Sequence, residues 1–75
     1  PFTASTSLEL NCRTDGEVNV EILTATGKKV MSIERYCHSG PNRFEIDGSD
    51  LTGGVYYVVI HADGAVVTKK IILMQ

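Results

Sequence analysis

The sequence predicts an all-β fold, an antiparallel β-sandwich, and three observations support this. Apolar and polar residues alternate with a period of two, turn signals containing glycine separate the alternating segments, and no segment has the period of an amphipathic helix. A strand with one buried face and one wet face produces this alternation. Six strands are visible, and residues around Phe2 are expected to add a short seventh, which makes a sandwich of about seven strands.

The first two predicted strands show the alternation most clearly. Their apolar residues occupy every second position: Leu8, Leu10, Cys12, Val18, Val20 and Ile22. Asp15 and Gly16 divide the two strands, and glycine supplies the positive φ that a tight connection uses. We therefore expect a hairpin here. Its register is well specified, because a slip of one residue would turn the apolar set toward water.

The third predicted strand, residues 28–34, is irregular. It follows a turn at Gly27, and Val30 lies on one parity while Met31 and Ile33 lie on the other. Such a pattern indicates either a β-bulge or a strand that is covered on both sides.

Two loops surround the fourth predicted strand. Residues 36–41 are expected to form the first loop, and Phe44 and Ile46 mark the strand that follows it. Residues 48–54 form the second loop, in which Leu51 is the single apolar anchor. We expect Leu51 to close one end of the sandwich.

The fifth predicted strand, residues 55–60, has no polar face. This is typical of a central strand that is flanked by others and covered on both sides. Gly54 lets the backbone turn tightly into it, and Val55 begins it. Tyr56 and Tyr57 point to opposite faces, so one of them is expected in the core.

The last predicted strand, residues 65–74, follows a turn at Gly64 and carries two lysines between apolar residues. Apolar side chains occupy both parities, with Lys69 on one and Lys70 on the other. A twist or bulge near the lysines would let both halves bury their apolar residues. A strand at a sheet edge can pair with another chain, so this segment is a core strand, a docking element or both, and dimerisation through the edge stays open.

Size and charge limit the function classes. Seventy-five residues make one domain, spanning residues 1–75, and a chain that begins at Pro1 is expected to be a fragment of a larger protein. The net charge is −2 with a pI near 5.5. This argues against nucleic acid or an anionic membrane as a partner, because both favour a basic surface.

The candidates for chemistry are few. Cys12 and Cys37 are the two cysteines, and both separate thiols and a disulfide formed in an oxidising compartment remain open. The spacing of zinc ligands is absent, and we expect no metal and no cofactor. His38 is adjacent to Cys37, but neighbouring residues of an extended loop point apart, so we expect no enzyme activity.

Four pieces of the sequence occur together in one order. They are Pro1-Phe2; the segment 16–30 with Gly16 and Gly27; the segment 51–58 with Leu51, Gly54, Val55 and Tyr56; and the segment 64–73 with Gly64 and the two lysines. In this combination the chain resembles the C-terminal sorting domains of cargo proteins of the type IX secretion system, type A of the Por secretion family. The resemblance covers essentially the whole chain, and the two cysteines depart from the family pattern.

The resemblance implies an immunoglobulin-like sandwich and a role as an export address. It implies a cargo domain upstream in the same chain and recognition by an outer-membrane translocon. Transit through the periplasm would end at the cell surface or outside the cell, after a sortase-like peptidase removes the domain. It also implies that five residues near the end of the chain carry the recognition: Lys69, Lys70, Ile71, Ile72 and Leu73.

A second interpretation is an accessory β-sandwich of a cell-surface enzyme, either a spacer or a carbohydrate-binding module. Sugar binding usually uses a flat row of exposed aromatic side chains. The chain has no Trp and three Tyr, two of which lie in the predicted central strand. The composition therefore favours the sorting domain over this alternative.

Overall fold

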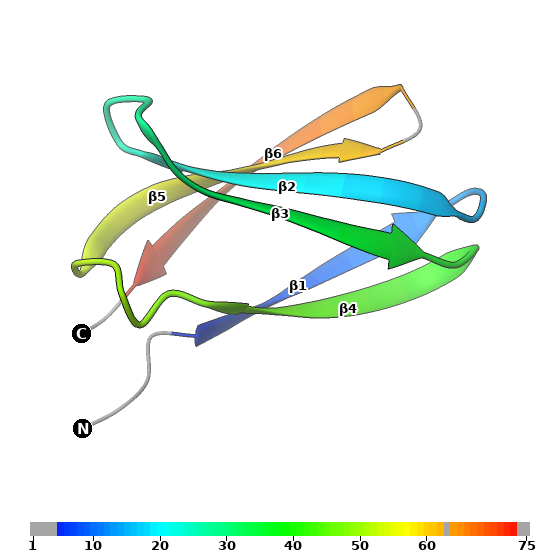
Figure 1. Ribbon diagram of the computed structural model, residues 1–75, viewed down its shortest axis with the longest axis horizontal. Coiled ribbons are helices and arrows are strands. Elements are labelled where there is room, and N and C mark those ends of the chain that lie inside the picture. Colours follow the sequence, from blue (N-terminus) through cyan, green and yellow to red (C-terminus); the bar gives the residue numbers. More distant parts are fainter. Residues whose placement is uncertain (1–4, 63, 74–75) are drawn as a thin grey trace.

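The computed structural model describes residues 5–62 and 64–73. In order, the strands are β1 (Ser5–Cys12), β2 (Gly16–Thr24), β3 (Lys29–Cys37), β4 (Gly40–Asp47), β5 (Gly54–Ala62) and β6 (Ala65–Leu73). They form two antiparallel sheets, β1-β4 and β3-β2-β5-β6, which pack face to face (Figure 1). The predicted all-β sandwich is confirmed with six strands in the described residues. The seventh, expected around Phe2, lies outside them.

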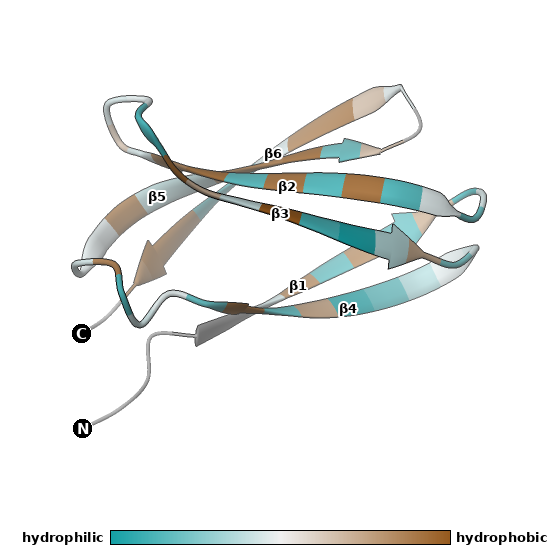
Figure 2. Cartoon of the chain, in the orientation of Figure 1, coloured by the Kyte–Doolittle hydropathy of each residue, from teal (hydrophilic) through white to brown (hydrophobic). Residues whose placement is uncertain are grey.

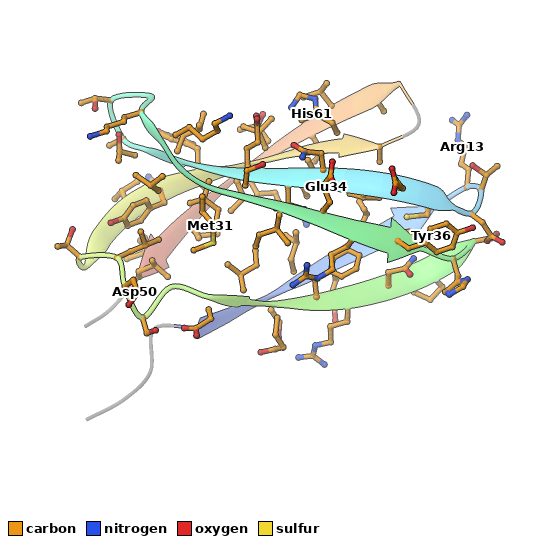
Figure 3. All side chains as sticks on the ribbon, in the orientation of Figure 1. Arg13, Met31, Glu34, Tyr36, Asp50 and His61 are labelled. Carbon is orange, nitrogen blue, oxygen red and sulfur yellow. The ribbon has the colours of Figure 1, made fainter. Side chains whose placement is uncertain are left out.

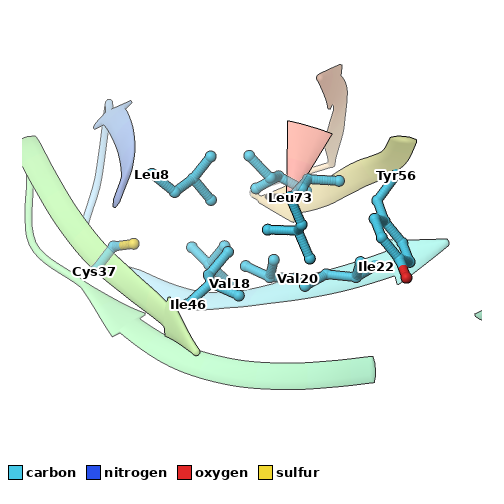
Figure 4. Packing of buried hydrophobic residues seen from close by; sticks show 10 residues of the cluster. Leu8, Val18, Val20, Ile22, Cys37, Ile46, Tyr56 and Leu73 are labelled. Atoms are coloured by element: carbon cyan, nitrogen blue, oxygen red, sulfur yellow. The ribbon is translucent and has the colours of Figure 1, made fainter. Parts of the chain in front are cut away.

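The period-two alternation builds the core between the sheets. Figure 2 shows it as alternating apolar and polar bands along β2. Val18, Val20 and Ile22 point inward and are at most 2% exposed. The buried cluster in Figure 4 consists of these three residues with Leu8, Cys37, Ile46, Tyr56, Val58, Ile60 and Leu73.

The expected hairpin between the first two strands is wrong. β1 pairs with β4 and β2 pairs with β3, so the connection at residues 13–15 passes from one sheet to the other. The chain does turn at Asp15 and Gly16, but the turn leads to the other sheet. Asp15 Oδ1 there accepts a hydrogen bond from Ser39 N at 2.7 Å. Two strands show the same alternation whether they pair within one sheet or pack against each other from opposing sheets. Alternation alone therefore does not distinguish the two arrangements.

The expected loop at residues 36–41 is also wrong in extent. β3 continues to Cys37 and β4 begins at Gly40, so His38 and Ser39 alone connect them. Gly40 has a φ of 103°, which a residue with a side chain rarely adopts. The Asn42 side chain stabilises this short connection, since its Oδ1 accepts from His38 N at 3.1 Å and its Nδ2 donates to His38 O at 2.7 Å.

The irregularity of β3 is a β-bulge, which was one of the two alternatives that the sequence left open. Ile22 lies opposite Met31, but the next residue, Leu23, lies opposite Lys29, so Val30 is the extra residue. The bulge accounts for the parity change in the sequence.

β5 is a central strand, as predicted, with β2 and β6 on its two sides. The expectation that both of its faces are covered is wrong. Tyr56 and Val58 face the other sheet and are buried, whereas Val55 is 36% exposed and Tyr57 and Val59 are half-buried on the outer face. A single layer packs against this sheet, so only one face of β5 is covered.

Candidate recognition surface

β6 lies at the edge of the four-stranded sheet and pairs with β5 alone among the described strands. The pairing is uninterrupted, with Ala65 opposite Ala62 at one end and Leu73 opposite Gly54 at the other. The ladder therefore contains no bulge near the lysines, and the expectation that both halves of the strand bury their apolar residues is wrong. As a result the two parities of β6 stay on opposite faces of the sheet for its whole length. Residues 65–70 are exposed on both faces, and the faces differ in burial only at Ile71 and Leu73.

The inner face of β6 carries Lys69 together with residues that pack toward the core. Leu73 is buried at 5% exposure, and Ile71 is half-buried against the cluster. Lys69 lies opposite Val58, and its Nζ donates to the backbone carbonyl of Glu9 in β1 at 3.4 Å. Lys69 thus connects the edge of one sheet to a strand of the other sheet, which is a contact within the domain.

The outer face of β6 is open to solvent. Val66 is 59% and Ile72 is 65% exposed, and Thr68 and Lys70 between them are also exposed. Lys70 forms no hydrogen bond or ion pair with the part of the chain that the structure describes. At the other edge of the same sheet, by contrast, Lys29 Nζ lies 3.5 Å from Glu21 Oε2. An unpaired cation between two exposed apolar side chains is suited to binding a partner.

A groove lies beside the beginning of β6, where the edges of the two sheets meet. It has a volume of about 410 Å³, and its apolar wall includes Leu10, Cys12, Val18 and Val67. The connection at residues 13–15 forms its polar rim. Strands β1 and β6 therefore flank an opening of the sandwich and do not close it.

Three of the four motif residues around the start of β5 have clear structural roles. Leu51 packs against the core as expected, and Gly54 has a φ of 148°. Val55 lies on the outer face and Tyr56 on the inner one. The Tyr56 hydroxyl donates to the carbonyl oxygen of Thr52 at 2.6 Å. This bond back to the upstream backbone resembles the tyrosine corner of immunoglobulin-like sandwiches, and it holds the loop to the strand.

The remaining motif glycines lie at strand connections. Gly27 and Gly64, in the β2–β3 and β5–β6 turns, have φ values of 95° and 75°, in the left-handed region that favours glycine. Gly16 is the first residue of β2.

Cys12 and Cys37 lie together at one end of the sandwich, and both are free thiols in this structure. Cys12 lies close enough to Cys37 to affect the pKa of its thiol. Burial, together with a smaller contribution from Cys12, raises the pKa of the Cys37 thiol to about 11. A thiol that stays protonated at neutral pH is a poor nucleophile, so Cys37 lacks the lowered pKa of a catalytic cysteine.

The two histidines occupy exposed positions. The ring of His38 packs edge-on against Tyr36 with a centroid separation of 5.3 Å, and His61 Nε2 lies 3.4 Å from Glu21 Oε1 on the outer face. Figure 3 shows Tyr36 and His61 on different parts of the molecule. The described residues contain no group of three or more His, Cys, Asp or Glu side chains that could hold a metal ion.

The geometry is that of a β-sandwich without a catalytic cluster among the described residues, and β6 is one of the two edge strands of the larger sheet. A family profile described as the secretion system C-terminal sorting domain matches residues 1–74. The chain belongs to this family, whose members are sorting signals of the type IX secretion system. A sorting signal is not itself catalytic, and the match favours this function over an accessory or sugar-binding module.

The other two comparisons, with curated proteins and with solved structures, gave no match. No helix long and apolar enough to cross a membrane occurs in the described ranges. As a type IX signal, the domain implies a cargo protein upstream, the type IX machinery as its partner, and export to the cell surface or beyond.

Two features of the surface were not foreseen from the sequence. One is the bond between Lys69 and the carbonyl of Glu9, since sequence reasoning treated Lys69 and Lys70 alike. The other is the bond between Tyr56 and Thr52. The alternation within residues 65–73 was the available signal for the first, because it already placed the two lysines on opposite parities.

Proposed function

We propose that the secretion machinery recognises the outer face and the unpaired edge of β6. Of the five residues that the family resemblance implicates, Lys70 and Ile72 would contact the machinery. Lys69, Ile71 and Leu73 would hold the strand in place. This division rests on one observation. Lys70 and Ile72 are exposed without partners among the described residues, whereas Ile71 and Leu73 pack toward the core and the exposed Lys69 bonds to the opposite sheet.

The chemistry of this surface selects the kind of partner. An open strand edge offers backbone N–H and C=O groups to an added strand, and the alternate side chains supply specificity. Lys70 favours an acidic group opposite it, and Val66 and Ile72 favour apolar pockets on either side. A second copy of this chain suits the edge less well, because antiparallel pairing centred on Lys69 would bring the lysines of both copies together.

The remaining steps follow from the family role. The cargo would precede Pro1, and the domain would pass through the periplasm before the translocon carries it across the outer membrane. A sortase-like peptidase would then cut upstream of the sandwich. None of these steps requires the domain to carry out a reaction. Its contribution is a stable fold that leaves β6 exposed.

Export of a fused reporter tests this proposal. A periplasmic reporter protein joined upstream of Pro1 is expected to reach the cell surface or the medium in a strain with a type IX system. The same fusion without residues 69–75 is expected to remain in the periplasm. The measurement is the fraction of reporter outside the outer membrane, by immunoblotting of cell fractions. Equal export of both fusions would contradict the proposal.

A further inference from the structure

The register of the two sheets brings the cysteines together. Cys12 is the last residue of β1 and lies opposite Gly40, the first residue of β4. Cys37 is the last residue of β3 and lies opposite Gly16, the first residue of β2. The short connections after the two cysteines therefore cross at the same end of the sandwich, where the arrowheads of β1 and β3 lie (Figure 1).

Hydrogen bonds hold these two connections to each other. Ser39 N donates to Asp15 Oδ1 at 2.7 Å, and Ser39 Oγ donates to the carbonyl oxygen of Arg13 at 3.2 Å. The two bonds join the connection that follows Cys12 to the one that follows Cys37. The cysteines thus belong to a fixed corner, and a fixed corner favours a reaction between the groups that it carries.

The surroundings of the two thiols differ in a useful way. Cys37 is 1% exposed and belongs to the core cluster, as Figure 4 shows. Cys12 is half-buried and lines the groove at the junction of the sheets. A reagent from solution can therefore reach Cys12 directly, and Cys37 only through Cys12.

We propose that Cys12 and Cys37 form a disulfide in the exported domain and so join β1 of the two-stranded sheet to β3 of the four-stranded sheet. The proposal rests on the export of the domain, because the surroundings outside the cell are oxidising. It does not depend on which face of β6 the machinery recognises. The two strands belong to different sheets, so the bond adds a covalent connection where side-chain packing otherwise holds the layers together.

The oxidant is a disulfide, either a small molecule such as oxidised glutathione or a protein that carries one. The Cys12 thiolate attacks this disulfide and forms a mixed disulfide, and one half of the oxidant leaves as a thiolate. The Cys37 sulfur then attacks the Cys12 sulfur, gives up its proton in this slower step, and expels the other half. Both leaving thiolates take up the protons that the cysteines released. The pair of cysteines loses two electrons, and the oxidant is reduced to two thiols.

The bond would stabilise the smaller sheet in particular. An isolated pair of strands is marginal in water, and β1 and β4 pair only with each other among the described strands. A disulfide that closes a loop restricts the unfolded chain and disfavours unfolding, more so for longer loops. The loop between Cys12 and Cys37 contains all of β2 and nearly all of β3. A domain that must stay folded outside the cell benefits from this constraint.

The test compares the chain of residues 1–75 in reducing buffer and in buffer with oxidised glutathione. Peptide mapping without reduction should show a peptide that contains Cys12 joined to one that contains Cys37. The midpoint of thermal unfolding should rise by at least about 8 °C on oxidation. The double variant Cys12→Ser/Cys37→Ala is the control, and its midpoint should be the same in both buffers.

Two results would overturn the proposal. One is wild-type protein that keeps two free thiols, or forms bonds only between molecules, after exposure to the oxidant. The other is an exported reporter fusion, alkylated at harvest, in which both cysteines carry the alkyl label. The peptide mapping on wild-type protein does not depend on how the variant folds. The in vitro result also does not depend on export, so the disulfide proposal can fail or hold independently of the proposal that β6 is recognised.

Discussion

The double substitution Lys70→Glu/Ile72→Thr is expected to abolish export of a fused reporter while the domain stays folded. Both side chains are exposed, so neither change removes packing from the core. Glutamate reverses the charge offered to the partner, and threonine keeps the β-branched shape that suits a strand but removes apolar surface. A misplaced charge at an interface costs several kcal/mol, so the exported fraction should fall by at least about tenfold.

A matched variant at the other edge of the same sheet is the control. Lys28→Glu/Val30→Thr likewise reverses one lysine and replaces one β-branched apolar residue by threonine at exposed positions, but at β3 and not at β6. This fusion is expected to be exported as well as wild type. Thermal unfolding of both isolated domains shows whether either has lost stability. Normal export of the Lys70→Glu/Ile72→Thr fusion, or equal loss in both fusions, would argue against β6 as the surface that is read.

The substitution Ile22→Ala is expected to lower the free energy of unfolding by about 2–5 kcal/mol. Ile22 is fully buried on β2, which lies between β3 and β5 in the larger sheet. Truncation leaves a cavity that the surrounding side chains fill only in part. Small domains have total stabilities near the lower end of about 5–15 kcal/mol, so the variant should be close to unfolding at room temperature.

Urea titration followed by circular dichroism measures this effect. Val66→Ala is the comparison, because it also truncates a β-branched residue in this sheet but at 59% exposure, and it should change stability by less than about 0.5 kcal/mol. Similar losses in both variants would contradict the placement of the core between the two sheets. In the export assay, the Ile22→Ala fusion should be lost through unfolding and proteolysis, whereas the Lys70→Glu/Ile72→Thr fusion should accumulate intact in the periplasm.

The strands themselves could be predicted from the sequence, because burial on one face imposes a period of two. Val18, Val20 and Ile22 show this most clearly. The bulge in β3 was also visible, since an extra residue shifts the parity at Val30. The pairing of β1 was not visible. A turn at Asp15 and Gly16 fits a hairpin and a crossing between sheets equally well, and distant partners decide between them.

The candidate surface was predicted in part. The sequence located the lysine-bearing strand, but mixed parity suggested a twist or bulge that would bury both apolar sets. The strand instead stays regular and leaves Val66 and Ile72 exposed. Because the strand stays regular, Lys69 and Lys70 lie on opposite faces, and Lys69 alone bonds to the other sheet. The proximity of the cysteines could not be predicted, because it depends on which connections cross between the sheets.

Site-specific photo-crosslinking in living cells tests the central claim most directly. A photoreactive amino acid replaces Lys70 on the outer face of β6, or Glu45 on the outer face of the two-stranded sheet, in an export-competent reporter fusion. Irradiation should yield an adduct with a component of the type IX machinery from position 70 and none from position 45. The adduct should be absent from a strain that lacks the secretion system. Adducts from position 45 with none from position 70 would show that another face of the sandwich is read.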